Sequence, residues 1–250
     1  MIELLRDNGL YLLIGEYPQG PLGGLALTLI LSALSMALVF PLAVALALAR
    51  TSGKRPLALA VAAYVNFIRC IPQLLLIFWI YLFVPVVIGF PLTGFATLVA
   101  SIALYQSAYL SEVIRAGILA LPKGQIESAH ALGLRWFPTT FKIVLPQVLF
   151  NVSPGILNVL TIVVKETSLG YMVGVGELSM TASHVNSLTL TKPLQIFAIL
   201  AITYFVICYG ISRLVRLLEA RVERQMRSAG DDDEARALIS ANRSVEASAL

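Results

Sequence analysis

Long runs without a charged residue constrain the fold of this sequence more than any other feature. They cover Gly23–Ala49, Cys70–Ser111, Ile143–Val164 and Pro193–Ser212. Each run is long enough to cross a lipid bilayer, because a spanning helix needs about 20 mostly apolar residues. Charged residues make up only 13% of the 250 residues, and hydrophobic residues make up 58%. A soluble domain of this size cannot bury that much apolar surface, so the sequence predicts an all-α integral membrane protein.

The second run is long enough for two helices, and Gly89-Phe90-Pro91 near its centre predicts a tight turn between them. We therefore expect five transmembrane helices. Their predicted ranges are Leu22–Ala49, Pro72–Ile88, Thr93–Arg115, Ile143–Val164 and Pro193–Leu214. The apolar stretch Leu57–Ile68 is too short to cross. It is either a helix along the membrane before Pro72 or an early extension of the second span.

The basic residues predict how the chain is oriented. Most of them follow the first, third and fifth spans: Arg50, Lys54, Arg55, Arg69, Arg115, Lys123, Arg135, Lys142, Arg213, Arg216, Arg221, Arg224 and Arg227. The other side carries only Arg6, Lys165 and Lys192. Because cytoplasmic loops retain lysine and arginine, we expect the N-terminus outside and the C-terminus in the cytoplasm.

Three regions follow from this topology. Residues 1–21 form an outer-surface segment that lacks the basic start and cleavage site of a signal peptide. Residues 22–217 form the membrane domain. Residues 218–250 form a cytoplasmic tail that contains Asp231-Asp232-Asp233-Glu234 and is solvated.

Neither an enzyme nor a nucleic-acid-binding protein fits this sequence. No glycine-rich loop is followed by lysine and serine or threonine, so nothing cradles nucleotide phosphates. The two histidines, His130 and His184, fall on opposite sides of the membrane and cannot share a metal ion. Cys70 and Cys208 lie far apart in apolar stretches. We expect no catalytic residue, no metal site and no cofactor, which leaves a transporter or a channel.

The loop between the third and fourth spans, residues 116–142, is long for a connector. Its sequence predicts a helix over Gln125–Leu132, a stop at Gly133 with positive φ, and a second helix with Pro138 in its first turn. Ile126, Ala129, His130 and Gly133 recur at helical spacing and predict an exposed face of small residues. This helix-turn-helix either docks another protein or only stiffens the loop.

One stretch of the loop resembles a known signature. Glu127-Ser128-Ala129 is followed after three residues by Gly133, after nine more by Ile143, and after one more by Leu145-Pro146. The permease subunits of ABC importers carry Glu-Ala-Ala, Gly, Ile and Leu-Pro at the same spacing. Ser128 stands where that family usually has alanine, and both residues are small.

The resemblance extends over roughly Gly23 to Leu217 and narrows to polar amino-acid permeases of the histidine/glutamate/glutamine/arginine/opine class. It rests on these stretches: 25–52, Arg69-Cys70-Ile71-Pro72-Gln73-Leu74, Ser107-Ala108-Tyr109, Glu112, Arg115-Ala116-Gly117-Ile118, Gly124-Gln125, Pro146-Gln147 and Lys165-Glu166-Thr167-Ser168-Leu169. The family usually has leucine at Gln73 and aspartate at Glu166.

The resemblance implies a type I ABC-importer permease fold in a bacterial inner membrane. It implies three partners: a dimer of ATP-binding cassette subunits that hydrolyses ATP, a second permease subunit, identical or paralogous, and an extracytoplasmic substrate-binding protein. The coupling residues would be Glu127, Ser128, Ala129, Gly133, Leu145 and Pro146. From the residues alone, a stand-alone secondary transporter or channel remains the alternative, although no internal repeat supports it.

Polar residues at membrane depth are the candidates for the substrate pathway, because such residues are costly there and usually face an interior. Tyr105, Tyr109 and Glu112 share one helix face beside Gln106, where they line the pathway or bond neighbouring helices. Glu112 either pairs with Arg115 or faces the pathway.

A second candidate group, Glu166, Thr167 and Ser168, ends the fourth predicted span. A carboxylate there suits the ammonium group of an amino acid. The alternative is a salt bridge of Glu166 that fixes the end of the span, with Lys165 as its partner.

Overall fold

The computed structural model describes residues 2–189, 192–214, 216–217 and 220, and these residues form helices and no strand. The elements are α1 (Ile2–Ile14), α2 (Gly24–Thr51), α3 (Arg55–Cys70), α4 (Gln73–Phe78), π-helix η1 (Trp79–Phe83), α5 (Val84–Ile88), α6 (Gly94–Ala120), α7 (Lys123–Ala131), α8 (Trp136–Pro138), π-helix η2 (Thr139–Val144), α9 (Leu145–Asn151), α10 (Ser153–Glu166), 3₁₀-helix η3 (Thr167–Val173), α11 (Leu178–Thr189) and a last helix, Pro193–Leu214. Almost all of the predicted tail, including Arg221, Arg224 and Arg227, lies outside the described residues.

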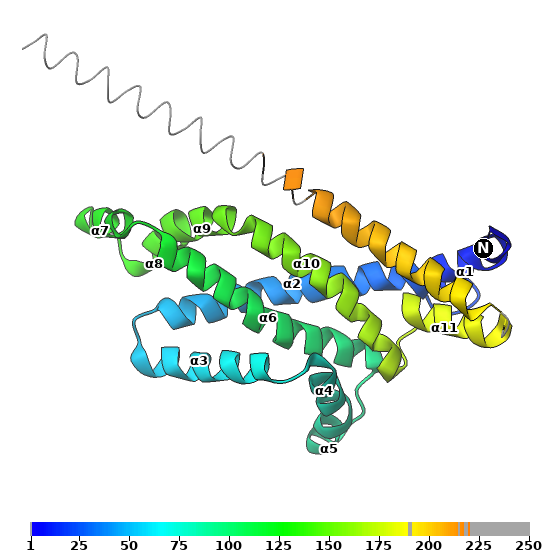
Figure 1. Cartoon of the computed structure of the whole chain (residues 1–250). Helices are drawn as coiled ribbons and strands as arrows, with labels where there is room; N and C mark the ends of the chain where they lie inside the picture. The colour runs from blue at the N-terminus through cyan, green and yellow to red at the C-terminus, as the bar shows by residue number, and fades with distance from the viewer. Residues whose placement is uncertain (1, 190–191, 215, 218–219, 221–250) are drawn as a thin grey trace, which may run out of the picture.

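The centre of the fold is the pair α2 and α6, which pack along much of their length beside α10 (Figure 1). Small and hydroxyl residues allow this close approach. Ser101, Ser107 and Ser111 of α6 each donate a hydrogen bond to a carbonyl three residues earlier, so their hydroxyls are satisfied within the helix. Elsewhere on α6, a Cβ at Gly117 would lie 2.6 Å from Cγ1 of Val152, between α9 and α10, so a larger residue would force this contact to shift. Such small residues let helices pack in a membrane, where apolar surface gives little driving force.

Three helices are long and apolar enough to cross a membrane: Gly24–Thr51, Ser153–Val173 and Pro193–Leu214. A bent pair, Arg55–Cys70 with Gln73–Ile88, makes a fourth if it counts as one span. The first and last predicted spans therefore agree with the structure to within about two residues. The predicted third span, Thr93–Arg115, overlaps α6, which is one continuous helix of 27 residues. Helix α6 is not among these candidate spans, so the described residues support three or four of the five predicted spans.

The stretch before Pro72 is a separate helix. Leu57–Ile68 lies in α3, and α3 meets α4 at an angle of 105°. Proline causes this break, because Pro72 cannot continue a helix and keeps Ile71 extended, with φ −100° and ψ 146°. Figure 1 shows α3 running back beside α2 and α6, while α4 and α5 leave the bundle. Leu57–Ile68 is therefore a helix of its own, and both interpretations of it stay predictions, because the bent pair counts either as one broken span or as two separate segments.

The fourth predicted span is shifted along the chain. The structure has a candidate span at Ser153–Val173, about ten residues beyond the predicted Ile143–Val164. The residues before it form η2 and α9, which are separated from α10 at Val152. Consequently Glu166 lies inside the candidate span rather than at its end. The prediction ended the span at the first charges, whereas the helical path continues through η3.

The elements sort to two ends of the bundle. Figure 1 places α7 and α8 at one end, near the start of α3, and α1 and α11 at the other. Two apolar clusters follow this division. One cluster fills the centre with residues such as Leu31 and Ile102, and a smaller one joins α1, α11 and the last helix through residues such as Leu12, Ala182 and Ile199. The first segment thus contributes a packed helix at the predicted outer end.

Candidate substrate pathway and coupling surface

A pocket of about 550 Å³ lies in the membrane part of the bundle. Helices α3, α6 and α10 provide its walls. The lining residues are Arg69, Tyr105, Gln106, Tyr109, Glu112, Val113, Ala116, Asn158, Val159, Ile162 and Glu166. Two sets of predicted pathway residues that lie far apart in sequence therefore meet in one pocket: Tyr105, Gln106, Tyr109 and Glu112 from α6, and Glu166 from α10.

The carboxylate of Glu166 has one partner in this pocket. The amide Nε2 of Gln106 donates to Glu166 Oε1 at 2.6 Å. The second oxygen, Oε2, is buried and has no donor within hydrogen-bond geometry among the described residues, although the Gln73 side chain, whose Nε2 is also unpaired, lies close enough to act on this carboxylate. Lys165 is exposed and forms no ion pair with Glu166 in the described structure. A buried carboxylate oxygen without a donor is unfavourable, so this atom is suited to a ligand that brings a donor.

Aromatic rings form the middle of the pocket. The hydroxyls of Tyr105 and Tyr109 lie 3.5 Å apart, and their ring centroids 5.2 Å apart. The guanidinium of Arg69 lies over the Tyr109 ring at 5.1 Å from its centroid, and the Tyr109 hydroxyl donates to the Arg69 carbonyl at 3.3 Å. Arg69 was predicted as one of the loop cations after the first span. The structure instead places it at the pocket, because α3 runs back along the bundle.

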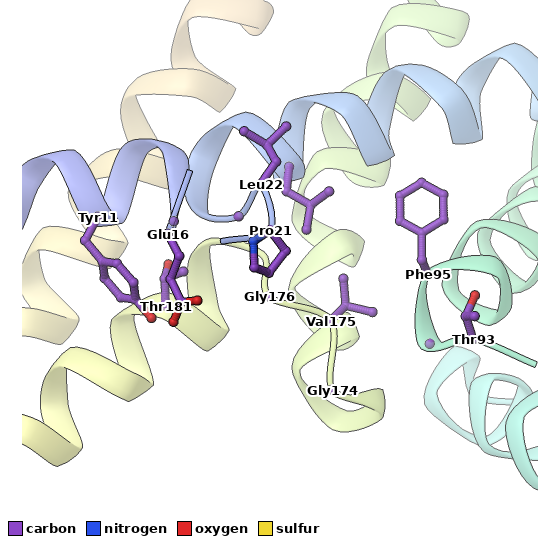
Figure 2. Close-up of a pocket in the computed structure, with 14 residues that line it drawn as sticks. Tyr11, Glu16, Pro21, Leu22, Thr93, Phe95, Gly174, Val175, Gly176 and Thr181 are labelled. Carbon is purple, nitrogen blue, oxygen red and sulfur yellow. The ribbon is translucent and has the colours of Figure 1, made fainter. Parts of the chain in front are cut away.

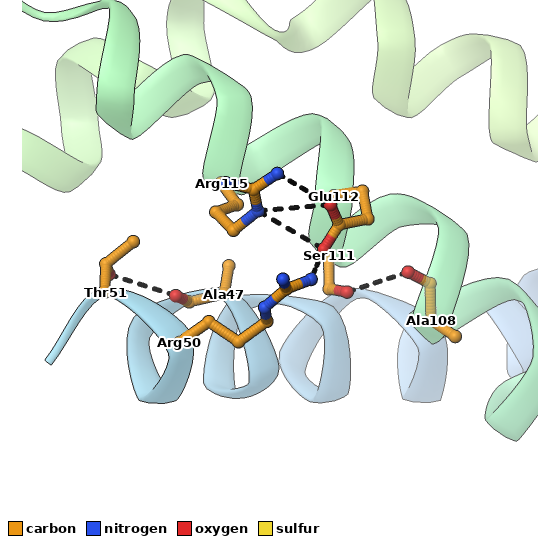
Figure 3. A network of polar contacts seen from close by, with 7 residues as sticks. All are labelled: Ala47, Arg50, Thr51, Ala108, Ser111, Glu112 and Arg115. Carbon is orange, nitrogen blue, oxygen red and sulfur yellow. Dashed lines mark hydrogen bonds and ion pairs between the residues drawn. The ribbon is translucent and has the colours of Figure 1, made fainter. Parts of the chain in front are cut away.

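Glu112, which lines the pocket, belongs to a three-residue ion network with Arg50 and Arg115 (Figure 3). Glu112 and Arg115, three residues apart on α6, form the predicted pair, with Arg115 Nη2 donating to Glu112 Oε2 at 2.8 Å. Arg50 at the end of α2 donates to the other oxygen of Glu112. Glu112 therefore forms the predicted pair with Arg115 and also lines the pocket, while its role in a substrate pathway stays a prediction.

Two predicted pathway residues lie elsewhere, and besides Arg69 one more polar residue of the pocket was missed. Thr167 is fully buried, and its hydroxyl donates to the Val164 carbonyl at 2.8 Å. The Ser168 hydroxyl donates to the Lys165 carbonyl at 2.6 Å. Neither residue lines the pocket. Asn158 does, and as an amide within an uncharged run it was visible in the sequence.

The loop of residues 116–142 is built as two short helical segments around a turn. Gly133 has φ 77°, which is the positive value expected for the residue that ends the helix. Its N–H donates to the His130 carbonyl at 2.9 Å, and the Leu134 N–H donates to the Ala129 carbonyl at 3.1 Å. These bonds cap α7. Pro138 lies in the first turn of the helical segment that starts at Trp136.

The predicted exposed face of this loop is wrong in part. Ala129 is only 3% exposed and Leu145 8%, and Ile126 packs against the central apolar cluster. The face that holds Ala129 points inward because the loop lies on the ends of the spans. Glu127, Ser128, Gly133 and Pro146 are exposed, and Leu132, at 81% exposure, stands out farthest. Ala129 and Leu145 therefore pack inward within this chain, and their part in coupling stays a prediction.

Comparison with known proteins identifies the family of this architecture. Residues 38–224 match the family described as "Binding-protein-dependent transport system inner membrane component". The L-cystine transport system permease protein TcyB of Bacillus subtilis is 36% identical over 203 residues, which cover 81% of this chain and 86% of TcyB. The probable glutamine ABC transporter permease protein GlnP of the same organism is 33% identical over 214 residues, covering 83% of this chain and 98% of GlnP.

A solved structure supports the same assignment. The chain superposes on a crystal structure of an amino acid ABC transporter with a TM-score of 0.71 and 30% sequence identity, over 79% of this chain and 92% of the other. The family match covers the central α2–α6 pair from residue 38 onward, the loop of residues 116–142 and the pocket. The chain therefore belongs to the family of inner-membrane components of binding-protein-dependent transport systems, and its similar relatives are permeases of amino-acid ABC transporters.

Proposed function

We propose that this chain is the membrane-spanning subunit of an ATP-driven, binding-protein-dependent importer of polar amino acids or related compounds such as opines. It provides half of the translocation pathway. Helices α3, α6 and α10 line the pocket of this chain. A second permease subunit, identical or paralogous, provides the other half of the pathway. ATP is hydrolysed by a separate ATP-binding subunit, and the permease itself catalyses no reaction.

One observation carries the substrate assignment: Glu166 Oε2 is buried at the pocket without a hydrogen-bond donor. An ammonium group supplies such a donor together with the opposite charge. Hydrogen bonds to charged groups are the strong ones, at about 1.5–3 kcal/mol. Every α-amino acid carries an ammonium group. Arg69 in the same pocket offers the opposite charge, and Gln106 and Asn158 offer amides for polar parts of the substrate.

The exposed residues of the loop, Glu127, Ser128, Gly133 and Pro146, form the proposed ATPase-coupling surface. The loop is at the end of the bundle that also holds Arg50, Lys54 and Arg55, which is the cytoplasmic end by its positive charge. The N-terminus, by the same argument, is outside. Reporter fusions test this orientation: fusions after Arg55 and within residues 123–142 read cytoplasmic, and one near Ser183 reads outside. A cytoplasmic signal at Ser183 refutes the orientation.

Co-purification tests the proposed function. The chain, expressed with an affinity tag in its native membrane and extracted in mild detergent, brings an ATP-binding subunit with it. The complex hydrolyses ATP and the permease alone does not. A permease that purifies without an ATPase and still transports amino acids down an ion gradient is a stand-alone secondary transporter, and this result refutes the proposal.

A further inference from the structure

A carboxylate outside the pocket has no role in the proposed pathway. Glu177 lies between η3 and α11 and is 0% exposed. Its Oε2 accepts hydrogen bonds from the Ser179 N–H at 2.9 Å and from the Tyr204 hydroxyl at 3.0 Å. Its Oε1 accepts from the Met180 N–H at 3.0 Å. One side chain thus caps the N-terminus of α11 and also reaches the last helix.

The backbone around Glu177 is joined to α2. The Leu178 N–H donates to Thr28 Oγ1 at 3.1 Å, and the Gly24 N–H donates to the Gly176 carbonyl at 2.9 Å. The donors of these two hydrogen bonds are backbone N–H groups, and the acceptors are a buried threonine hydroxyl and a backbone carbonyl. The segment 176–179 is therefore a junction at which α2, α11 and the last helix meet.

The junction is a polar attachment of the last helix. That helix is packed lightly, since only 11% of its most apolar stretch is buried inside the chain. Its apolar contacts belong to the smaller cluster with α1 and α11, not to the central one. The Tyr204 hydroxyl donates to Glu177 Oε2 and lies 3.3 Å from the Ser179 hydroxyl, so it links this helix to the start of α11 and, through the junction, to α2.

Helix capping alone does not explain a buried glutamate. A serine, threonine or aspartate at the helix start serves as a cap without moving a charge away from water. Burying a carboxylate is strongly unfavourable, and here burial raises the pKa of Glu177 despite the hydrogen bonds from Ser179, Tyr204 and Met180, which act in the opposite direction. The bond to Tyr204 joins two helices, which a local cap does not.

The junction also touches the segment that leads to the pocket. Helix η3 starts directly after Glu166, and its Gly170 packs against Glu177, since a Cβ at Gly170 would lie 3.5 Å from Glu177 Cγ. On its other side, Gly176 and Thr181 line a cavity of about 480 Å³ at the predicted outer end, together with Tyr11 and Glu16 (Figure 2). Glu177 therefore lies between the outer surface and the pocket.

We propose that Glu177 is a positioning residue that couples the outer end of the permease to the pathway. Glu177 holds α11, α2 and the last helix in one arrangement. When a protein docks on the outer end, these three elements therefore move together. This inference rests on the proposed function, because the docking protein is the extracytoplasmic binding protein. The inference adds that Glu177 is the residue that links docking of this protein at the outer end to the pathway.

The test measures coupling rather than assembly. The permease is reconstituted in liposomes with its ATP-binding subunit. ATP hydrolysis is then measured without the binding protein, and again after adding binding protein that has been incubated with a mixture of L-cystine, L-glutamine and L-arginine. The variants are Glu177→Gln, which removes the charge, and Tyr204→Phe, which removes one hydroxyl. Glu16→Gln, an exposed carboxylate at the same end, is the matched control.

In both variants we expect the complex to assemble and to keep its ATP hydrolysis without binding protein. The stimulation of hydrolysis by the binding protein falls at least about threefold. The control Glu16→Gln keeps the wild-type stimulation. A purely structural role predicts lower thermal stability with unchanged stimulation, and that result overturns the inference. If Glu177→Gln fails to fold, the result for Tyr204→Phe decides the test, because this variant leaves the hydrogen bonds between Glu177 and the start of α11 intact. A wild-type complex that the binding protein does not stimulate refutes the proposed function itself, and the inference with it.

Discussion

The Gln106 amide on α6 donates to the Glu166 carboxylate on α10 at 2.6 Å, and this bond joins the two helices that form most of the pocket wall. It holds one carboxylate oxygen in place and leaves the other without a donor. Since an unpaired carboxylate oxygen away from water is unfavourable, the apo permease is prepared for a ligand with a donor group. This geometry is the basis of the proposed amino-acid site.

The first prediction concerns the charge of Glu166. Glu166→Gln keeps the shape of the side chain and removes its charge. A charge-assisted hydrogen bond contributes about 1.5–3 kcal/mol, so we expect the apparent affinity for substrate to fall roughly ten- to a hundred-fold. Uptake measured over a range of substrate concentrations checks this, with assembly of the ATPase unchanged.

Lys165 provides the control for that variant. Lys165→Met changes an exposed residue that forms no ion pair with Glu166, and it keeps wild-type affinity. If the double variant Lys165→Met with Glu166→Gln regains normal uptake, then Glu166 serves only to balance Lys165. Unchanged affinity in Glu166→Gln alone removes the substrate role.

The second prediction concerns the turn at Gly133. With φ 77° and no atom within 4 Å of a built Cβ, the position is restricted by backbone conformation and not by space. A β-branched residue in this left-handed conformation costs about 1–2 kcal/mol. Gly133→Val therefore reshapes the exposed turn. We expect normal membrane levels, weaker binding of the ATPase and loss of ATP-driven uptake.

Gly124 offers a matched control in the same loop. It also has no atom within 4 Å of a built Cβ, but it lies in α7 with an ordinary helical backbone. Gly124→Val keeps ATPase binding and uptake. Equal behaviour of the two variants would mean that the turn geometry does not matter for coupling.

The third prediction separates the two roles of Glu112. Glu112→Gln weakens the pairing with both Arg50 and Arg115, whereas Arg115→Met removes only one pair. Because these side chains are partly exposed, each pair is worth about 0–1 kcal/mol. We expect Glu112→Gln to lower the unfolding temperature in detergent more than Arg115→Met does. If instead Glu112→Gln leaves stability unchanged and weakens substrate affinity, Glu112 acts in the pathway and not in the network.

The fourth prediction concerns pH and Glu177. Burial raises the pKa of Glu177, so the folded protein holds this proton more tightly than the unfolded chain. The resulting stability is present below the ordinary glutamate pKa and is lost as pH rises through the raised value. Of the titratable side chains in the described part, Tyr204 is the one that contacts this carboxylate.

Thermal unfolding between about pH 4 and about pH 7 measures this effect. The wild-type permease gains stability relative to Glu177→Gln as pH falls, while exposed Glu16→Gln follows the wild type. A relative gain for the wild type as pH rises would show that the pKa of Glu177 is lowered, as for a solvated helix cap.

The sequence predicts the local parts of this site better than the contacts between distant parts. The helical repeat of Tyr105, Tyr109 and Glu112 correctly puts them on one face, and Arg115 three residues on pairs with Glu112. Hydropathy alone does not show that Gln106 meets Glu166, 60 residues away, because that contact depends on how α6 and α10 pack. Arg50 joins Glu112 over 62 residues for the same reason.

Charge and hydropathy also mislead where a helix bends or a loop folds back. Counting charges placed Arg69 in a cytoplasmic loop, but the break at Pro72 leaves it at the end of α3 beside Tyr109. The small residues of α7 predict an open docking face, whereas Ala129 is buried against the span ends. Which face of a surface helix points inward depends on what lies beneath it, and periodicity among small residues does not reveal that.

The most direct test of the proposed function is ATP-dependent uptake in liposomes that contain this permease, its ATP-binding subunit and the binding protein. Radiolabelled L-cystine, L-glutamine and L-arginine are the probes, and ATP is supplied on the side of the ATPase. The proposal predicts that at least one of them accumulates only when ATP and all the components are present, and that Glu166→Gln weakens this uptake at low substrate concentration. Uptake by the permease alone, without ATP or its partners, would contradict it.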